Sequence, residues 1–364
     1  SEEGVSNTFK NPDMQYCTRC LNVSTRPRIT FNEEGLCNAC RWHDMKQITD
    51  WEERQTDLRG ICDSFKSKND FDVIVPVSGG KDGSYVAWKM REMGMHPLCI
   101  TLEPQMPTTI GKINLQNFKD QGFDHILISP NKELYRKIAK EGFVKYGQPK
   151  LPFVNGISTA IFEYARNYKI PFIMYGEEGE SEYGGGDSYQ GKIDDKYLKE
   201  KYYSDIDLSE YGYWWKFPET SPVYATHWSK FEDWDPEVHA RHAAKNCNMQ
   251  MLVNGSIGTF TNYSQLDDKL QDLHAFMMFV KYGFGRATSD ACIEIRRGRM
   301  TREDGFTAVK QLDGAFPLEY LEEYLKYFEM TNSEFWAVVD KFANKEVLEK
   351  NRNPAKPYVL RYHL

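Results

Sequence analysis

Residues 72–84, DVIVPVSGGKDGS, decide the fold class of this 364-residue chain. The run at 73–77 is apolar and rich in valine and isoleucine, which is typical of a strand buried on both faces of a parallel sheet. A glycine-rich turn follows at 78–83, and the residues from Ser84 to Gly94 have the pattern of a helix. A strand, a glycine-rich turn and a helix in direct succession predict the first unit of an α/β fold.

The same alternation continues along the chain. Further apolar strands are predicted at 97–102, 125–129 and 171–175. The segments between them, near 111–121, 131–145 and 158–168, have helical patterns. Parallel strands joined by crossover helices predict a doubly wound parallel sheet.

The turn at 78–84 has the composition of a phosphate-binding loop. Its glycines let the backbone approach an anion, and the following helix N-terminus offers N–H groups and the positive end of the helix dipole. The turn fits neither the Walker pattern G-x-x-x-x-G-K-S/T nor the dinucleotide pattern G-x-G-x-x-G. We therefore predict a phosphate loop of another type. Its candidate ligands are Ser78, Gly79, Gly80, Lys81, Asp82, Gly83 and Ser84.

Two pairs of cysteines precede this region in the arrangement C-x2-C-x16-C-x2-C. Two residues between thiolates bring both sulfurs to one corner of a tetrahedral site, and this spacing is typical of four-thiolate zinc sites. Four protein ligands leave no open position, so we expect a structural zinc, with an iron–sulfur cluster or redox dithiols as alternatives. The candidate ligands are Cys17, Cys20, Cys37 and Cys40.

Changes in composition and in predicted secondary structure divide the chain into four parts. We expect a zinc-ribbon module over 1–50, a linker helix over 51–69 and the α/β domain over 70–210. Residues 211–364 are predicted to form a mainly helical region that completes the substrate site. An acidic stretch at 177–210 holds eleven Asp and Glu side chains against four Lys.

Composition excludes several classes of protein. The net charge of −7 and the pI of about 5.7 argue against a surface that coats nucleic acid. No apolar run approaches the ~20 residues that cross a bilayer. The first residues, from Ser1 to Gly4, show no secretory signal. We therefore expect a cytoplasmic protein that binds neither nucleic acid nor membrane.

The loop SGGKDGS at 78–84 resembles the signature of the PP-loop ATP pyrophosphatases, which is SGGxD followed by two Ser or Thr residues. Gly83 departs from that signature. The superfamily includes asparagine, GMP and NAD synthetases and tRNA-modifying thiolases. The resemblance implies the adenine nucleotide alpha hydrolase-like form of the doubly wound fold. It also implies ATP cleaved between its α and β phosphates while the loop holds pyrophosphate.

Three longer stretches are similar to the N-acetyl sugar amidotransferases, the WbpG-like and PseA-like proteins of bacterial surface-sugar pathways. They are CTRCLNVSTRPRITFNEEGLCNAC at 17–40, NGISTAIFEYARNYKIPFIMYGEEGESEYGG at 155–185 and KYGFGRATSDACIEIRRGRMTRED at 281–304. The resemblance implies that ATP adenylates the acetamido carbonyl oxygen of an N-acetylated, nucleotide-linked sugar. Ammonia then gives an acetamidino sugar for lipopolysaccharide O-antigen or flagellar glycan.

Magnesium, which prefers oxygen ligands, is the cation expected beside ATP. Asp82 and a carboxylate from the acidic stretch are candidates to hold it, because that stretch follows the fourth strand at the edge where α/β sheets bind ligands. Within the stretch we favour Glu177 and Glu182. The candidate catalytic residues are thus Lys81, Asp82, Glu177 and Glu182.

Two cations of the KYGFGRATSD stretch are candidate ligands of pyrophosphate or of a substrate acid. They are Lys281 and Arg286, and a guanidinium fork matches the oxygens of such groups. The source of ammonia is expected to be another protein, because the cysteines outside the pairs lack the setting of a glutaminase nucleophile. The resemblance implies a glutaminase partner with a cyclase-like subunit, similar to the subunits of imidazole glycerol phosphate synthase.

Two alternatives stay open at this point. One is a PP-loop tRNA thiolase, in which Cys99 would serve the sulfur chemistry. The other is a non-catalytic zinc-ribbon scaffold that binds ATP.

Overall fold

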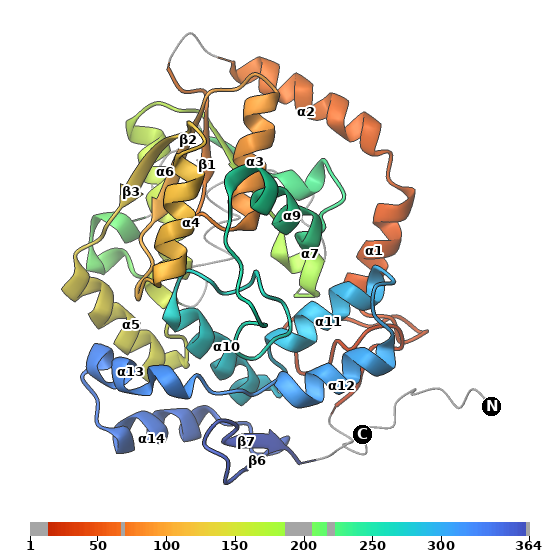
Figure 1. Ribbon diagram of the computed structural model, residues 1–364, viewed down its shortest axis with the longest axis vertical. Helices are drawn as coiled ribbons and strands as arrows, with labels where there is room; N and C mark the ends of the chain where they lie inside the picture. The colour runs from red at the N-terminus through yellow and green to blue at the C-terminus, as the bar shows by residue number, and fades with distance from the viewer. Residues whose placement is uncertain (1–13, 67–69, 186–205, 217–222, 362–364) are drawn as a thin grey trace.

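A five-stranded parallel sheet forms the centre of the protein. The computed structural model describes residues 14–66, 70–185, 206–216 and 223–361 (Figure 1). The strand order is β3-β2-β1-β4-β5, and every neighbouring pair is parallel. The strands are β1 (Val73–Pro76), β2 (Pro97–Leu102), β3 (Asp124–Ile128), β4 (Phe172–Tyr175) and β5 (Tyr224–His227). The predicted doubly wound parallel sheet is thereby confirmed.

Helices cover both faces of the sheet. One face packs Val73, Val75 and Met174 against α2 (Trp51–Phe65), α3 (Lys81–Glu92), α4 (Thr109–Lys119) and α9 (Pro236–Cys247). The other face packs Ile74, Ile100 and Ile173 against α6 (Leu151–Asn167). Helix α5 (Lys132–Tyr146) lies beside α6. Because successive residues of a strand point to opposite faces, the continuous apolar run in β1 serves both layers.

The fifth strand was not predicted from the sequence. Four residues, YATH, form β5, and β5 pairs with β4 at the edge of the sheet. A run of four residues is too short to show a clear periodicity in sequence. The strand is recognised only from its pairing with β4. It also lies beyond residue 210, where the sequence placed the end of the α/β domain.

The C-terminal helices form a second core below the sheet. Phe276, Phe328 and Phe335 meet Phe143 of α5 there. The elements of this core are α10 (Lys269–Tyr282), α13 (Leu321–Phe328), α14 (Asn332–Phe342) and a hairpin of β6 (Leu348–Lys350) and β7 (Tyr358–Leu360). Two further helices, α11 (Arg286–Arg296) and α12 (Arg302–Leu312), pack against the paired cysteines instead. Single 3-10 turns occur at Ser209–Tyr211, Tyr213–Trp215, Trp228–Lys230 and Leu318–Tyr320. In the described part of the chain, no helix has the length and apolar character needed to cross a membrane.

The cysteine-rich segment is packed into the rest of the molecule. Its helix α1 (Asn38–Ile48) lies beside the five-residue helix α7 (Gly179–Tyr183), and α11 lies close to both (Figure 1). The four paired cysteines share a buried cluster with Ala291 and Cys292 of α11. The N-terminal module is therefore joined to the C-terminal helices through a shared buried cluster.

Candidate active site

The loop at 78–84 joins the end of β1 to the start of α3. Gly79 has a φ of +86°, and a Cβ on it would lie 2.5 Å from the backbone nitrogen of Leu115. Only glycine tolerates both the conformation and the close approach. No described side chain caps the first turn of α3, so the N–H groups at its positive end are available to an anion.

Gly83 is the residue that departs from the PP-loop signature, and its surroundings explain the departure. A Cβ at Gly83 would lie 2.8 Å from the carbonyl oxygen of Pro76 and from the Cα of Val77. The first turn of α3 therefore packs directly on the end of β1. The Ser84 side chain is fully buried, and its hydroxyl has no hydrogen-bond partner among the described residues.

A cleft of about 410 Å³ lies beside this loop. It opens where the chain leaves β1 and β4, the neighbouring strands between which the strand order reverses. Open α/β sheets bind their ligands at this position. The cleft is lined by Ser78, Gly80, Lys81, Asp82, Gly83, Gly111, Asn114, Phe153, Glu177, Tyr183, Tyr263, Ser264, Gln265, Leu266, Asp267, Gln271 and Arg286.

Asp82 is held by two neighbours at the mouth of the loop. Its Oδ2 lies 2.7 Å from the Lys81 ammonium, and its Oδ1 lies 3.2 Å from Nδ1 of His239 on α9. Burial raises the pKa of Asp82, but Lys81 and His239 lower it by more than burial raises it. The pKa of Asp82 therefore lies below its usual value. Asp82 is therefore ionised and fixed in orientation.

His239 was not among the predicted site residues. Its ring is buried between two aromatic rings, with centroid distances of 4.2 Å to Tyr85 and 4.1 Å to Trp234. The sequence contains no local signal for this role, since the contact with Asp82 joins helices 157 residues apart.

Glu177 is the second carboxylate of the cleft. Its Oε2 accepts hydrogen bonds from Nε1 of Trp234 at 3.1 Å and from the hydroxyl of Tyr183 at 3.3 Å. Burial and the nearby Asp82 charge raise the pKa of Glu177 to about 7. At neutral pH, this carboxyl is thus poised between its two protonation states.

Glu182 and Lys281, both predicted site residues, do not line the cleft. The Glu182 carboxylate faces α1, where Oε2 lies 2.8 Å from Nζ of Lys46 and Oε1 accepts a hydrogen bond of 3.0 Å from Nε1 of Trp42. Lys281 lies in the last turn of α10, and burial lowers its pKa to about 8. Glu177 precedes the short helix α7 and Glu182 lies within it, and the two carboxylates bind different partners, Trp234 and Lys46.

Arg286 does reach the cleft, from the first residue of α11. Its Nε lies 3.1 Å from Oδ1 of Asp290, and its Nη2 donates to the Ser264 hydroxyl at 3.4 Å. The other oxygen of Asp290 accepts hydrogen bonds from Thr259 and Thr261 at 2.5 and 3.0 Å. A carboxylate held on both sides fixes the guanidinium in the cleft wall.

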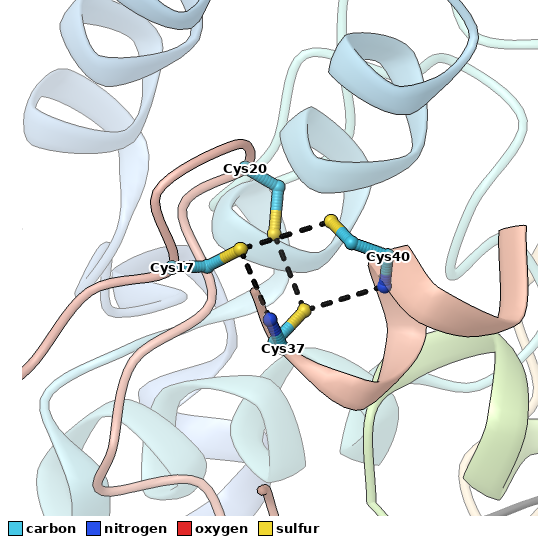
Figure 2. Close-up of side chains that lie close together, drawn as sticks. All are labelled: Cys17, Cys20, Cys37 and Cys40. Atoms are coloured by element: carbon cyan, nitrogen blue, oxygen red, sulfur yellow. Dashed lines mark hydrogen bonds between the residues drawn. The ribbon is translucent and has the colours of Figure 1, made fainter. Parts of the chain in front are cut away.

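The four paired cysteines converge on one point, as predicted (Figure 2). Cys17 Sγ lies 3.7 Å from Cys40 Sγ, and Cys20 Sγ lies 3.7 Å from Cys37 Sγ. A tetrahedral zinc with Zn–S bonds of ~2.3 Å requires sulfurs about 3.8 Å apart. The backbone N–H groups of Arg19, Asn22, Cys37 and Cys40 also point at these sulfurs. The geometry fits a closed, structural zinc site.

Comparison with known families assigns the C-terminal part of the chain. Residues 257–360 match the family described as LPS biosynthesis protein WbpG-like, C-terminal domain. This C-terminal segment is similar to a WbpG-like domain. The resemblance predicted from sequence is confirmed over this region, and the domain contributes Tyr263, Asp267 and Arg286 to the cleft beside the loop at 78–84.

Comparisons with whole proteins add little to this assignment. No curated protein matches the chain. A predicted subunit of tRNA methyltransferase from Methanocaldococcus jannaschii is 17% identical over 48% of this chain and 76% of its own, with a TM-score of 0.30. NMN synthetase from Francisella tularensis is 11% identical over 69% of this chain and 94% of its own, with a TM-score of 0.33. The WbpG-like domain and the phosphate loop together point to an ATP-dependent enzyme.

Proposed function

We propose that the protein is an ATP-dependent N-acetyl sugar amidotransferase. It adenylates the acetamido oxygen of a nucleotide-linked sugar and replaces that oxygen with nitrogen from ammonia. The observation that carries the proposal is the shared cleft: the WbpG-like domain and the PP-loop-like turn line the same cavity. A domain whose relatives act in lipopolysaccharide biosynthesis is thus placed against a phosphate-binding loop.

The chemistry needs activation because an amide carbonyl is a poor electrophile. In the first step, the acetamido oxygen attacks the α-phosphorus of ATP, and the α–β phosphoanhydride bond breaks to release pyrophosphate. In the second step, ammonia adds to the carbon of the O-adenylated imidate. The C–O bond then breaks, AMP leaves with the former amide oxygen, and nitrogen loses a proton to give the acetamidine.

The cleft residues suit the charges that develop in these steps. The N–H groups of the first turn of α3, together with Lys81, stabilise the pyrophosphate as it leaves. Arg286 lines the same cleft and offers its guanidinium to the phosphates or to an acid group of the sugar nucleotide.

Two carboxylates supply the oxygen donors that Mg²⁺ prefers, Asp82 and Glu177. The two carboxylates repel each other, and this repulsion helps to raise the pKa of Glu177. A cation bound between them would reduce the repulsion. Bound there, Mg²⁺ would neutralise phosphate charge. The Glu182 carboxylate is paired with Lys46 and is not among the ligands that we propose for the cation.

Ammonia is proposed to come from a separate glutaminase. The cysteines outside the zinc cluster are Cys62, Cys99, Cys247 and Cys292; all four are buried and none lines the cleft. Burial raises the pKa of Cys99 within β2, which makes its thiol a poor nucleophile. The same observation weighs against the tRNA thiolase, since that reaction would need a reactive sulfur near the loop.

The decisive experiment combines the purified chain with ATP, ammonium chloride and a panel of nucleotide-linked di-N-acetyl sugars. Mass spectrometry should detect a product in which NH replaces one oxygen, together with AMP and pyrophosphate. With a heavy-oxygen label in the acetamido group, the label should appear in AMP. Release of ADP, or no AMP with any sugar, would contradict the proposal.

Two controls accompany this assay. Glutamine in place of ammonium should give no product, because Cys62, Cys99, Cys247 and Cys292 are buried and do not line the cleft. Lys81→Met should bind the sugar but lose AMP formation, since the loop then lacks its cation. Turnover of glutamine by the isolated chain would refute the separate source of ammonia.

A further inference from the structure

Helix α7 is too short to hold its own conformation. It has five residues, Gly179–Tyr183, and a single helical turn is unstable without tertiary contacts. Yet the segment must be well placed, because Glu177 precedes it and Tyr183 ends it, and both line the cleft. The contacts that hold α7 are therefore contacts that shape the cleft.

The side chain of Glu182 anchors α7 to the cysteine module. Its carboxylate is bound by Lys46 and Trp42, which both belong to α1. The Lys46 and Glu182 side chains are only 3% and 9% exposed, so water weakens their attraction little. Helix α1 in turn begins at the second cysteine pair: Cys37 is its N-cap, and Cys40 lies in its first turn.

The backbone of α7 is bound at adjacent points by the same module and by α11. The Asn22 side-chain amide donates both to Cys37 Sγ at 3.5 Å and to the carbonyl oxygen of Tyr183 at 3.2 Å. Arg296 on α11 donates to the carbonyl oxygen of Glu182 at 2.8 Å. One amide thus bridges a candidate zinc ligand and the residue that lines the cleft.

From these contacts we infer that the metal-bound cysteine module positions α7, and through it the Glu177–Tyr183 pair in the cleft. Glu182 is then a positioning residue and does not touch substrate. The sulfur cluster fixes the start of α1, α1 holds Glu182, and the next residue, Tyr183, donates to Glu177. The choice of ATP as the reporter ligand rests on the proposed function; the mechanical link does not.

Glu182→Ala tests the link without altering a thiolate. We expect the variant to keep one zinc per chain and to show faster backbone hydrogen exchange over 177–185. Its affinity for a non-hydrolysable ATP analogue, measured by calorimetry, should fall about tenfold, because Glu177 and Tyr183 lose their placement. Removing zinc from the wild type with a chelator should accelerate exchange in the same segment.

Glu163→Ala is the matched control. Like Glu182, Glu163 is buried and forms an ion pair, in its case with Arg166 at 2.6 Å. It lies on α6, however, at the other face of the sheet. This variant should lose stability while keeping wild-type exchange over 177–185 and wild-type nucleotide affinity. If Glu182→Ala does not fold, Trp42→Phe removes one hydrogen bond to Glu182 and should show a smaller effect of the same kind.

The outcomes separate the two proposals. Wild-type exchange over 177–185 in Glu182→Ala or in the zinc-free protein would overturn the positioning role. Unchanged nucleotide affinity in a Glu182→Ala variant with faster exchange would overturn it too. If the wild type binds no ATP analogue, the proposed function fails, and the exchange data alone decide the link between the cysteine module and α7.

Discussion

His239 Nδ1 lies 3.2 Å from Asp82 Oδ1, and this contact ties α9 to the first turn of α3. Since Asp82 is ionised, the imidazole nitrogen donates and the carboxylate accepts. Lys81 occupies the other oxygen of Asp82 at 2.7 Å. The carboxylate at the phosphate loop is therefore fixed from two directions, and a histidine distant in sequence supplies one of them.

Replacing His239 should disturb the loop in a way that a suitable amide repairs. His239→Ala removes one of the two donors to Asp82 and should weaken ATP-analogue binding about tenfold. In His239→Asn, the side-chain amide can donate from the position of Nδ1 and should recover most of that affinity. Equal losses in the two variants would mean that only the packing of the ring between Tyr85 and Trp234 matters.

The raised pKa of Glu177 should make the stability of the protein depend on pH in the absence of magnesium. Its pKa is about 7 in the folded protein and 4.5 in its ordinary state, so folding takes up a proton between these values. The stability that Glu177 contributes is present below pH 4.5 and is lost as pH rises through 7. Glu177→Gln removes this loss and should be more stable than the wild type by about 2 kcal/mol at pH 8, with little difference at pH 5.

Urea unfolding at the two pH values measures this difference. Glu346→Gln, at an exposed position near the C-terminus, should show no such pH-dependent gain. Magnesium should reduce the gap at pH 8 if the cation binds beside Glu177. A Glu177→Gln variant that is less stable than the wild type at pH 8 would show that the ionised Glu177 carboxylate does not destabilise the folded protein.

The sequence predicted those parts of the fold and site that depend on local pattern. The β1–loop–α3 unit is set by one apolar run and its glycines, and the cysteine cluster by spacing. Strand β5 and helix α7 depend on partners that are distant in sequence, so their short segments carry no clear period. The same holds for the side chains: His239 joins the loop through α9, and Glu182 turns towards α1 because Lys46 and Trp42 bind it there.

Arg286 and Lys281 were predicted as equivalent cations, and the structure separates them. Arg286→Lys keeps the charge but loses the fork that Asp290 and Ser264 hold, so kcat/KM for ATP should fall by at least about tenfold. Lys281→Ala removes a cation that does not line the cleft and should leave kcat/KM near the wild-type value. Steady-state AMP release checks both, and a larger loss in Lys281→Ala would reverse the assignment.

Gly83 allows a test of why the loop departs from the PP-loop signature. Gly83→Ser restores the residue of the signature but places a Cβ 2.8 Å from the Pro76 carbonyl oxygen, so α3 must move away from β1. We expect a loss of about 1–3 kcal/mol in unfolding free energy and weaker ATP-analogue binding. Gly60→Ala is the matched control, because Gly60 lies inside α2 with no atom within 4 Å of its added Cβ. That variant should gain about 0.5–1 kcal/mol through helix propensity, and a stable, tightly binding Gly83→Ser protein would show that the packing of α3 on β1 does not require glycine.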